Sequence, residues 1–308
     1  MNTVTLGKST LIASRMAYGC WRIADTEEMG RTVGRAAILA AFEAGYTLFD
    51  HADIYCDGRA EEAFGQVLKE VPELRAKAVI ATKCGIRKEN EPGKGAPFRY
   101  DFSAEHIVRS CEGSLRRLGV ETIDVFQLHR PDWLMDPTEV AVAFARLNQA
   151  GKVREFGVSN FTPSQVALLN QACFRPMVVH QVEISLLCLE RFADGSLDQC
   201  LAQRITPLAW SPLGGGLLAE GAQRLLPWQE KYEARRILGE LDSMARSKDA
   251  SRSAVALAWL LKHPSGIVPL VGSTNVTRIR DAVRATEIEL TREEWYRLLE
   301  AARGERLP

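Results

Sequence analysis

One stretch decides the fold class of this chain: YTLFDHADIY, from Tyr46 to Tyr55. Its first residues predict a short apolar strand that ends on the carboxylate of Asp50. His51, Asp53 and Tyr55 follow at once. A strand that runs into ionisable side chains is typical of a barrel or an open α/β sheet, whose carboxyl edge carries the chemistry. The rest of the chain must then supply partners for Asp50 and Tyr55 at that edge.

The same pattern recurs along the chain, because short apolar strands alternate with helical segments. Strands are predicted at 16–20, 46–50, 78–83, 123–128, 155–158, 178–182, 206–210 and 267–271. Helices are predicted at 32–44, 61–69, 103–118, 137–150, 163–172, 197–203, 228–262, 277–285 and 292–302. Eight strand-helix units in 308 residues predict a closed (β/α)8 TIM barrel, formed by residues 1–308 as a single domain.

A doubly wound open sheet is the alternative fold, but no G-x-G-x-x-G follows the first strand. Two further segments are expected to decorate the barrel. Residues 3–6 and 11–13, around Gly7, predict an N-terminal β-hairpin, and extra helices follow the seventh strand. Residues 85–102 predict a long loop without periodicity, which should overhang the site.

The composition is that of a globular protein, with 46% hydrophobic and 25% charged residues. A formal net charge of +0 argues against nucleic acid or an anionic membrane as the main partner. The seven cysteines are irregularly spaced and form no C-x-x-C, which indicates reduced thiols and no metal site. No signal peptide or membrane span is evident, so a cytoplasmic protein, a monomer by default, is expected.

Four acid-base groups are predicted to meet at the carboxyl edge: Asp50, Tyr55, Lys83 and His129. They follow three neighbouring strands. A free tyrosine has a pKa near 10, and a lysine ammonium beside it favours the phenolate. A carboxylate would hold that lysine in place, and an imidazole can orient a carbonyl oxygen. The four residues together suit the protonation of an oxyanion as a hydride reaches carbon.

Each of the four also has a structural explanation when it is taken alone. A strand-end aspartate such as Asp50 is as often a cap as a catalytic group, and Tyr55 by itself would be a rim aromatic. His129 alone would be a structural histidine. Lys83 is the hardest to explain this way, because a buried ammonium needs a partner. His51 and Asp53 are interpreted as structural residues.

The sequence resembles the aldo-keto reductase family over nearly its whole length. The segments HQVEIS and AWSPLGGGLL resemble most closely its bacterial branch of broadly acting oxidoreductases. The family motifs occur in the expected order as GYTLFD-HADIY at 45–55, IATK at 80–83, LHRPD at 128–132, GVSNF at 157–161, QVE at 181–183 and WSPLG at 210–214.

This resemblance implies a (β/α)8 barrel that binds NADPH, with NADH as a possible second donor, and reduces small-molecule aldehydes or ketones to alcohols. Tyr55 would be the general acid, Lys83 and Asp50 would tune it, and His129 would place the carbonyl. Ser159, Asn160 and Gln181 would hydrogen-bond the nicotinamide amide. Trp210 would lie against the nicotinamide ring, and the pyrophosphate would pass along Ser211, Pro212, Leu213 and Gly214.

The last strand is followed by Gly272, Ser273 and Thr274, with Arg278 one turn later. Barrels often bind phosphate after strands seven and eight, where helix N-termini present backbone N–H groups. By resemblance, Ser273 and Arg278 would hold the 2′-phosphate of NADPH, and arginine suits a bidentate phosphate contact. Two positions depart from the family pattern: Gly272 replaces a lysine and Ala282 an asparagine common among relatives.

The sequence is compatible with one other function and disfavours a second. An NADP-binding regulatory or redox-sensing module on the same fold would carry out only incidental turnover. A metal- or phosphosugar-dependent lyase is disfavoured, because no further His, Asp or Glu ligands cluster. The substrate would be selected by Trp21, Arg22, Trp133, the 85–102 loop and the turn after Pro212.

Overall fold

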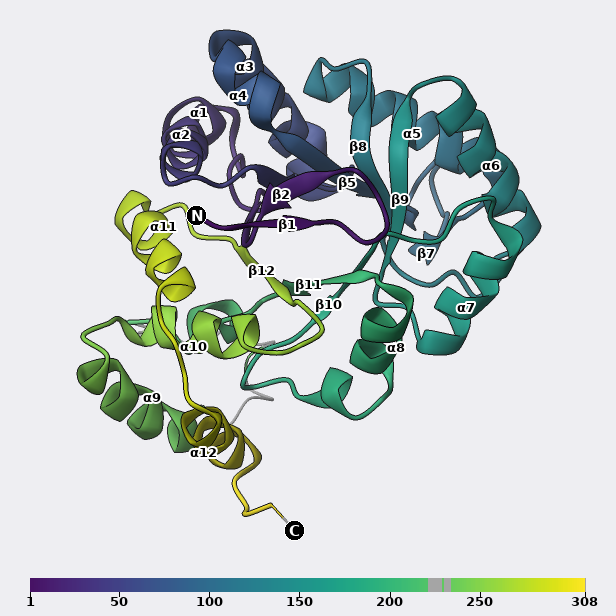
Figure 1. Ribbon diagram of the computed structural model, residues 1–308. Coiled ribbons are helices and arrows are strands. Elements are labelled where there is room, and N and C mark those ends of the chain that lie inside the picture. The colour runs from purple at the N-terminus through teal and green to yellow at the C-terminus, as the bar shows by residue number, and fades with distance from the viewer. Residues whose placement is uncertain (221–228, 230–233, 308) are drawn as a thin grey trace.

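The computed structural model describes residues 1–220, 229 and 234–307. Its centre is a closed barrel of parallel strands, and helices cover the outside (Figure 1). The strands, in barrel order, are β10 (Val179–Glu183), β11 (Thr206–Trp210), β12 (Val268–Val271), β3 (Ala17–Gly19), β4 (Leu48–Asp50), β5 (Val79–Cys84), β8 (Ile123–Leu128) and β9 (Val153–Ser159). The prediction of a (β/α)8 barrel is confirmed, and the open doubly wound sheet is excluded.

The helices between the strands follow the predicted order. The α-helices are α1 (Glu27–Met29), α2 (Arg35–Glu43), α3 (Arg59–Glu70), α4 (Pro72–Lys77), α5 (Ala104–Leu118), α6 (Pro137–Gln149), α7 (Pro163–Ala172), α8 (Ser196–Gln203), α9 (Arg235–Ser247), α10 (Arg252–Leu261), α11 (Val276–Ala282) and α12 (Arg292–Arg303). The shorter turns are η1 (Gly30–Gly34), η2 (Tyr55–Gly58), η3 (Glu190–Phe192), η4 (Gly214–Gly216) and η6 (Val283–Thr286). None of the helices in the described ranges is long and apolar enough to cross a membrane.

The long helical region predicted at about 228–262 is interrupted, because its described part holds two helices, α9 and α10. The chain leaves α9 at Asp249, whose φ of 48° is left-handed. Ser251 then caps α10 by accepting the backbone N–H of Ala254 at 3.0 Å. Serine side chains favour such caps over helix interiors, which is why the break falls there. Trp228, the predicted start, lies outside the described residues.

The stretch 85–102 is also more regular than predicted. Strands β6 (Ile86–Arg87) and β7 (Arg99–Tyr100) pair antiparallel within it, with Ile86 opposite Tyr100. Phe102 is buried, so the returning end of this segment is anchored in the core. Of this whole stretch, Ile86 reaches the cavity described below.

The predicted N-terminal hairpin is present and closes one end of the barrel (Figure 1). It consists of β1 (Thr3–Thr5) and β2 (Ile12–Ser14). Leu6, Leu11 and Ala13 join one buried apolar cluster with side chains of the barrel strands. Burying a leucine side chain contributes about 2 kcal/mol. Because the hairpin occupies this end, the carboxyl ends of the strands are left to form the site.

Candidate active site

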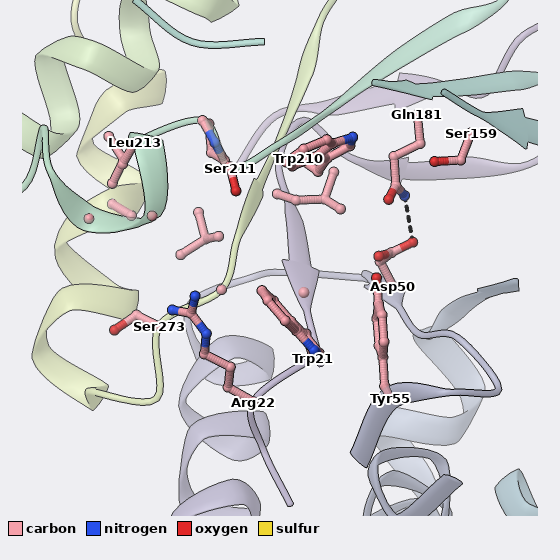
Figure 2. A pocket seen from close by; sticks show the side chains of 18 of the residues that line it. Trp21, Arg22, Asp50, Tyr55, Ser159, Gln181, Trp210, Ser211, Leu213 and Ser273 are labelled. Carbon is pink, nitrogen blue, oxygen red and sulfur yellow. Dashed lines mark hydrogen bonds between the residues drawn. The ribbon is translucent and has the colours of Figure 1, made fainter. Parts of the chain in front are cut away.

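A cavity of about 540 Å³ opens at the carboxyl ends of the barrel strands (Figure 2). Its wall includes residues from strand ends all around the barrel, from Gly19 on β3 to Val271 on β12. The predicted site residues that line it are Trp21, Asp50, Tyr55, His129, Ser159, Asn160, Gln181, Trp210, Ser211, Pro212, Leu213, Gly272, Ser273 and Arg278. The chemistry predicted for separate motifs is therefore gathered at one place.

Strand register explains how Asp50 meets Lys83. Asp50 pairs with Ala81 across β4 and β5, and Ala81 belongs to the cluster inside the barrel. Lys83 follows Ala81 by two residues, so it points to the same inner face. Its Nζ donates to both carboxylate oxygens of Asp50 at 2.8 and 2.7 Å and to the carbonyl of His51 at 2.7 Å.

Lys83 is 1% exposed, and all three of its N–H donors are used in these bonds. Burial by itself would lower the pKa of Lys83, but the charges of Asp50 and Tyr55 outweigh it and the pKa is raised. The ammonium therefore stays charged at neutral pH. The result is a fixed positive charge beneath the cavity floor.

Tyr55 is placed next to this charge by the short turn η2, which follows β4. Cys56 and Asp57 take left-handed φ values of 50° and 58° in that turn. Lys83 Nζ lies 5.0 Å from the centroid of the Tyr55 ring. The rings of Trp21 and His129 flank Tyr55, with centroids 6.3 and 5.9 Å away. Tyr55 is thus a half-buried phenol held between two aromatic rings.

The electrostatics of Tyr55 correct one expectation from the sequence. Burial raises the pKa of Tyr55 above 10, and this effect outweighs the opposing charge of Lys83. The sequence alone suggested that the lysine would prevail. The charge of Lys83 and its side-chain hydrogen-bonding interaction with the phenol both lower this pKa, but the pKa of Tyr55 remains raised because burial has the larger effect. The phenol keeps its proton at neutral pH.

His129 directly follows β8 and stays neutral. Burial lowers the pKa of His129 well below 6.5, and the charges of Lys83 and Arg130 add to this effect. Its Nδ1 is buried and has no hydrogen-bond partner among the described residues. A neutral imidazole can donate one N–H to a carbonyl oxygen in the cavity it lines.

Gln181 is tied to the Asp50-Lys83 pair. Its Nε2 donates to Asp50 Oδ1 at 2.7 Å, the bond drawn in Figure 2. Asp50 therefore accepts from Gln181 as well as from Lys83. The sequence did not reveal this bond, because the two residues are 131 positions apart.

Asn160 links the ends of three strands. Its Nδ2 donates to the carbonyl of His129 at 3.1 Å and to Ser159 Oγ at 2.8 Å. Its Oδ1 accepts the indole N–H of Trp210 at 3.0 Å. Asn160 has a left-handed φ of 65°, which asparagine tolerates better than most residues. The side chain thereby fixes the orientation of the Trp210 ring over the cavity.

Two turns form the opposite part of the wall. After β11, Ser211 (φ 48°) begins a turn in which Gly214, Gly215 and Gly216 all have positive φ. After β12, Arg278 lines the cavity and donates to the carbonyl of Glu220 at 3.0 Å. Glycines let the backbone of the first turn face the cavity without a side chain in between.

The predicted anion site at the start of α11 is partly occupied by the chain itself. Asn275 Oδ1 accepts the backbone N–H of Arg278 at 3.1 Å, and Ser273 Oγ accepts that of Asn275 at 3.2 Å. The hydroxyl of Ser273 and the guanidinium of Arg278 still line the cavity. An anion bound here would therefore contact these two side chains, because the backbone N–H groups of Asn275 and Arg278 are already hydrogen-bonded.

Four predicted residues are not part of the cavity wall: Lys83, Trp133, Gly214 and Thr274. Lys83 lies beneath the wall, where it donates to Asp50, which does line the cavity. Trp133 is 94% exposed, in the loop between β8 and α6. Residues that line the cavity without having been assigned a site role are Gly19, Ile54, Arg130, Ala219, Ser253, Leu270 and Val271. Ile86 from the 85–102 loop, Gly215 and Gly216 from the turn after Pro212, and Ala282 also line it. Arg22, expected to help select the substrate, also lines it.

His51 and Asp53 lie behind the cavity, as interpreted from the sequence. His51 packs on Phe64 with ring centroids 4.6 Å apart, and burial lowers its pKa to about 3. Asp53 accepts a hydrogen bond from Ser110, and burial raises its pKa to about 7.

Comparisons with known proteins agree with this geometry. The model of the aldo/keto reductase family matches residues 15–303. The chain belongs to the aldo/keto reductase family. It is 42% identical to a 6-dehydroglucose reductase of Novosphingobium aromaticivorans, across 98% of this chain and 96% of that protein. It is 40% identical to the oxidoreductase YdhF of Escherichia coli, across 96% of this chain and 95% of that protein.

Solved structures of this family have the same fold. An aldo-keto reductase from Bacillus halodurans, in its holo form, superposes with a TM-score of 0.80 at 25% identity, covering 100% of this chain and 98% of that one. This aldo/keto reductase is therefore an NAD(P)H-dependent oxidoreductase that acts on carbonyl groups.

Proposed function

We propose that this aldo/keto reductase reduces aldehydes or ketones to alcohols with NADPH, and that Tyr55 is the general acid. One observation carries the proposal. Lys83 holds three hydrogen bonds to Asp50 and His51, and this charged pair lies beneath a phenol and an imidazole that line the same cavity. A buried ion pair directly below two proton-bearing groups is suited to stabilise charge that develops there.

The residues of the cavity fit a phosphate-bearing dinucleotide. Trp210 offers a flat ring, and the glycine turn after β11 gives open backbone. Arg22 and Arg278 line the side formed by β3 and β12. Among the described residues of the wall, Asp50 is the one carboxylate, and Lys83 neutralises it. Ser273 and Arg278 would hold the 2′-phosphate, which supports a preference for NADPH over NADH.

The residues of the chain would act in the following way. NADPH, when bound, supplies the hydride. His129 donates a hydrogen bond that directs the carbonyl oxygen toward the Tyr55 hydroxyl. Tyr55 gives its proton to that oxygen as negative charge develops on it, and Lys83 stabilises the phenolate left behind. The raised pKa of Tyr55 ensures that the proton is present before the reaction.

Further features support a cytoplasmic enzyme acting on small molecules. All seven cysteines are free thiols, as expected in a reducing compartment. Two relatives, from N. aromaticivorans and Agrobacterium fabrum, are named 6-dehydroglucose reductase. Their names support a small, polar aldehyde as the kind of carbonyl compound reduced here.

The proposal is tested with Tyr55→Phe, which removes the proton and keeps the ring. We expect kcat to fall by about 10²- to 10⁴-fold, whereas the Kd of NADPH, followed by tryptophan fluorescence, stays within about twofold because the phenol contacts the substrate. Activity within tenfold of the wild type would remove Tyr55 from this role. A wild-type protein that binds NADPH but oxidises it with no aldehyde, dicarbonyl or quinone would favour the regulatory alternative.

A further inference from the structure

Arg130 is a cationic residue of the cavity that the proposed reaction does not use. It directly follows His129 and is half-buried in the cavity wall. Its guanidinium lies 5.6 Å from the centroid of the Trp210 ring. Within the described ranges it has no hydrogen bond and no ion pair. A cation withdrawn from water without a partner is costly, so this position calls for a negative charge from outside the chain.

Two acidic residues that could have paired with Arg130, one close in the chain and one in the same cavity, are already engaged. Asp132, two residues along, uses its oxygens to accept the backbone N–H groups of Phe102 and Leu134, both at 2.9 Å. Asp50, which shares the cavity, is held by Lys83 and Gln181. The guanidinium therefore has no hydrogen-bond acceptor among the residues that the structure describes, and its fork of donors matches the geometry of a carboxylate or a phosphate.

The barrel order separates Arg130 from the expected 2′-phosphate of the cofactor. Arg130 follows β8, and the Ser273-Arg278 turn follows β12, which lies four strands away in either direction around the closed barrel. Arg22 follows β3, the neighbour of β12, and Figure 2 shows it on the Ser273 side, with Trp21 between it and Tyr55. Arg22 thus belongs to the cofactor side of the cavity, whereas Arg130 lies beside the reacting groups.

We propose that Arg130 binds an anionic group, a carboxylate or a phosphate, carried by the carbonyl substrate. The inference rests on the proposed reductase function and adds the charge of the substrate to it. With the carbonyl oxygen at Tyr55 and His129, the anionic end of the substrate would pair with the guanidinium beside Trp210. A short aldehyde with an acidic group at its far end fits this arrangement.

The experiment compares charged aldehydes with uncharged counterparts of similar size. Succinic semialdehyde is paired with butanal for the carboxylate, and glyceraldehyde 3-phosphate with glyceraldehyde for the phosphate. We expect the wild type to favour at least one charged compound in kcat/KM. Arg130→Met, which keeps an apolar contact with Trp210, should cost that compound about 10²-fold. The same variant should change the uncharged aldehyde less than about threefold, and Arg130→Lys should restore part of the preference.

The possible results distinguish a failure of this inference from a failure of the proposed reductase function. Equal kcat/KM for charged and uncharged aldehydes in the wild type would overturn the inference and leave the reductase function in place. Equal losses for both aldehydes in Arg130→Met would do the same, because they would show a structural role against Trp210. A wild type that reduces none of the four compounds, or any other carbonyl, would remove the reductase function and the inference together. Arg22→Gln is the matched comparison, and it should raise the KM of NADPH without changing the ratio between charged and uncharged aldehydes.

Discussion

Two parts of the site are built in opposite ways: the floor, formed by the Asp50-Lys83 pair, and the rim, where Arg22 and Arg130 lie. On the floor, Lys83 is buried and every N–H of its ammonium is paired within the chain. On the rim, Arg22 and Arg130 rest against tryptophan rings without an acidic partner in the described part of the chain. The Lys83 ammonium is fully hydrogen-bonded before any ligand binds, whereas the guanidinium groups on the rim can still pair with an anionic ligand. The charge on the floor therefore serves the proton-donating groups above it, whereas the charges of Arg22 and Arg130 remain able to bind ligands.

The largest effect is expected from breaking the floor with Lys83→Met. This change leaves Asp50 buried without its partner, which costs about 3–5 kcal/mol in free energy of unfolding. Turnover should fall by at least about 10³-fold, because the charge that stabilises the Tyr55 phenolate is gone. Denaturant unfolding and NADPH oxidation measure the two effects.

The double variant Asp50→Asn/Lys83→Met is the control, because it removes both charges. It should regain most of the lost stability and remain inactive. A single variant as stable as the wild type would contradict the view that the floor depends on this pair.

A smaller effect is expected on the rim from Arg278→Ala. Its guanidinium is expected to pair with the 2′-phosphate, which NADH lacks. The Kd of NADPH should rise by about 10²-fold and that of NADH by less than about threefold. Fluorescence titration with each cofactor measures this, and equal losses for both would count against the phosphate assignment.

Behind the floor, Asp53 predicts a pH effect on stability. Its pKa is raised to about 7 in the folded protein, so the folded state binds a proton more tightly than the unfolded state. The contribution of Asp53 is therefore fully present below about pH 4 and is lost as the pH rises to about 7. Asp53→Asn cannot ionise, and relative to the wild type it should gain at most about 4 kcal/mol between pH 4 and pH 8.

Urea unfolding of both proteins at the two pH values measures this gain. A difference between variant and wild type that is the same at both values would show that Asp53 keeps an ordinary pKa. The activity of Asp53→Asn near pH 7 serves as the check that the floor itself is intact.

The smallest effect is expected for Trp133→Ala. Its side chain is 94% exposed and does not line the cavity. The value of kcat/KM should change less than about twofold, and the free energy of unfolding by less than about 0.5 kcal/mol. A larger loss of kcat/KM with a bulky aldehyde would return Trp133 to the substrate site expected from the sequence.

The parts of the structure that the sequence predicted are those where helical or strand periodicity marks the elements. Strand ends such as Asp50, Lys83 and His129 could be located, because parallel strands bring their carboxyl ends to one edge. Gln181 was assigned to the cofactor, but its bond to Asp50 needs the barrel to close over 131 residues. Ala219 and Ser253 line the cavity from segments between strands, and nothing in their local sequence marks them. The helical region at about 228–262 was predicted, but the break between α9 and α10 within it was not located, because no glycine or proline marks it between 247 and 251.

The N-terminal hairpin has a consequence for how the chain folds during synthesis. The N–H of Gly7 donates to Thr206 Oγ1 at 2.8 Å, and the Arg15 guanidinium donates to the carbonyl of Ile267. A side chain at Gly7 would strike the Val178 backbone 2.6 Å away, so the turn fits against β10 only as glycine. The first residues to leave the ribosome must therefore wait for some of the last strands before they can dock. The hairpin therefore closes its end of the barrel late in folding. Until then Leu6 and Leu11 are exposed to water and to other chains.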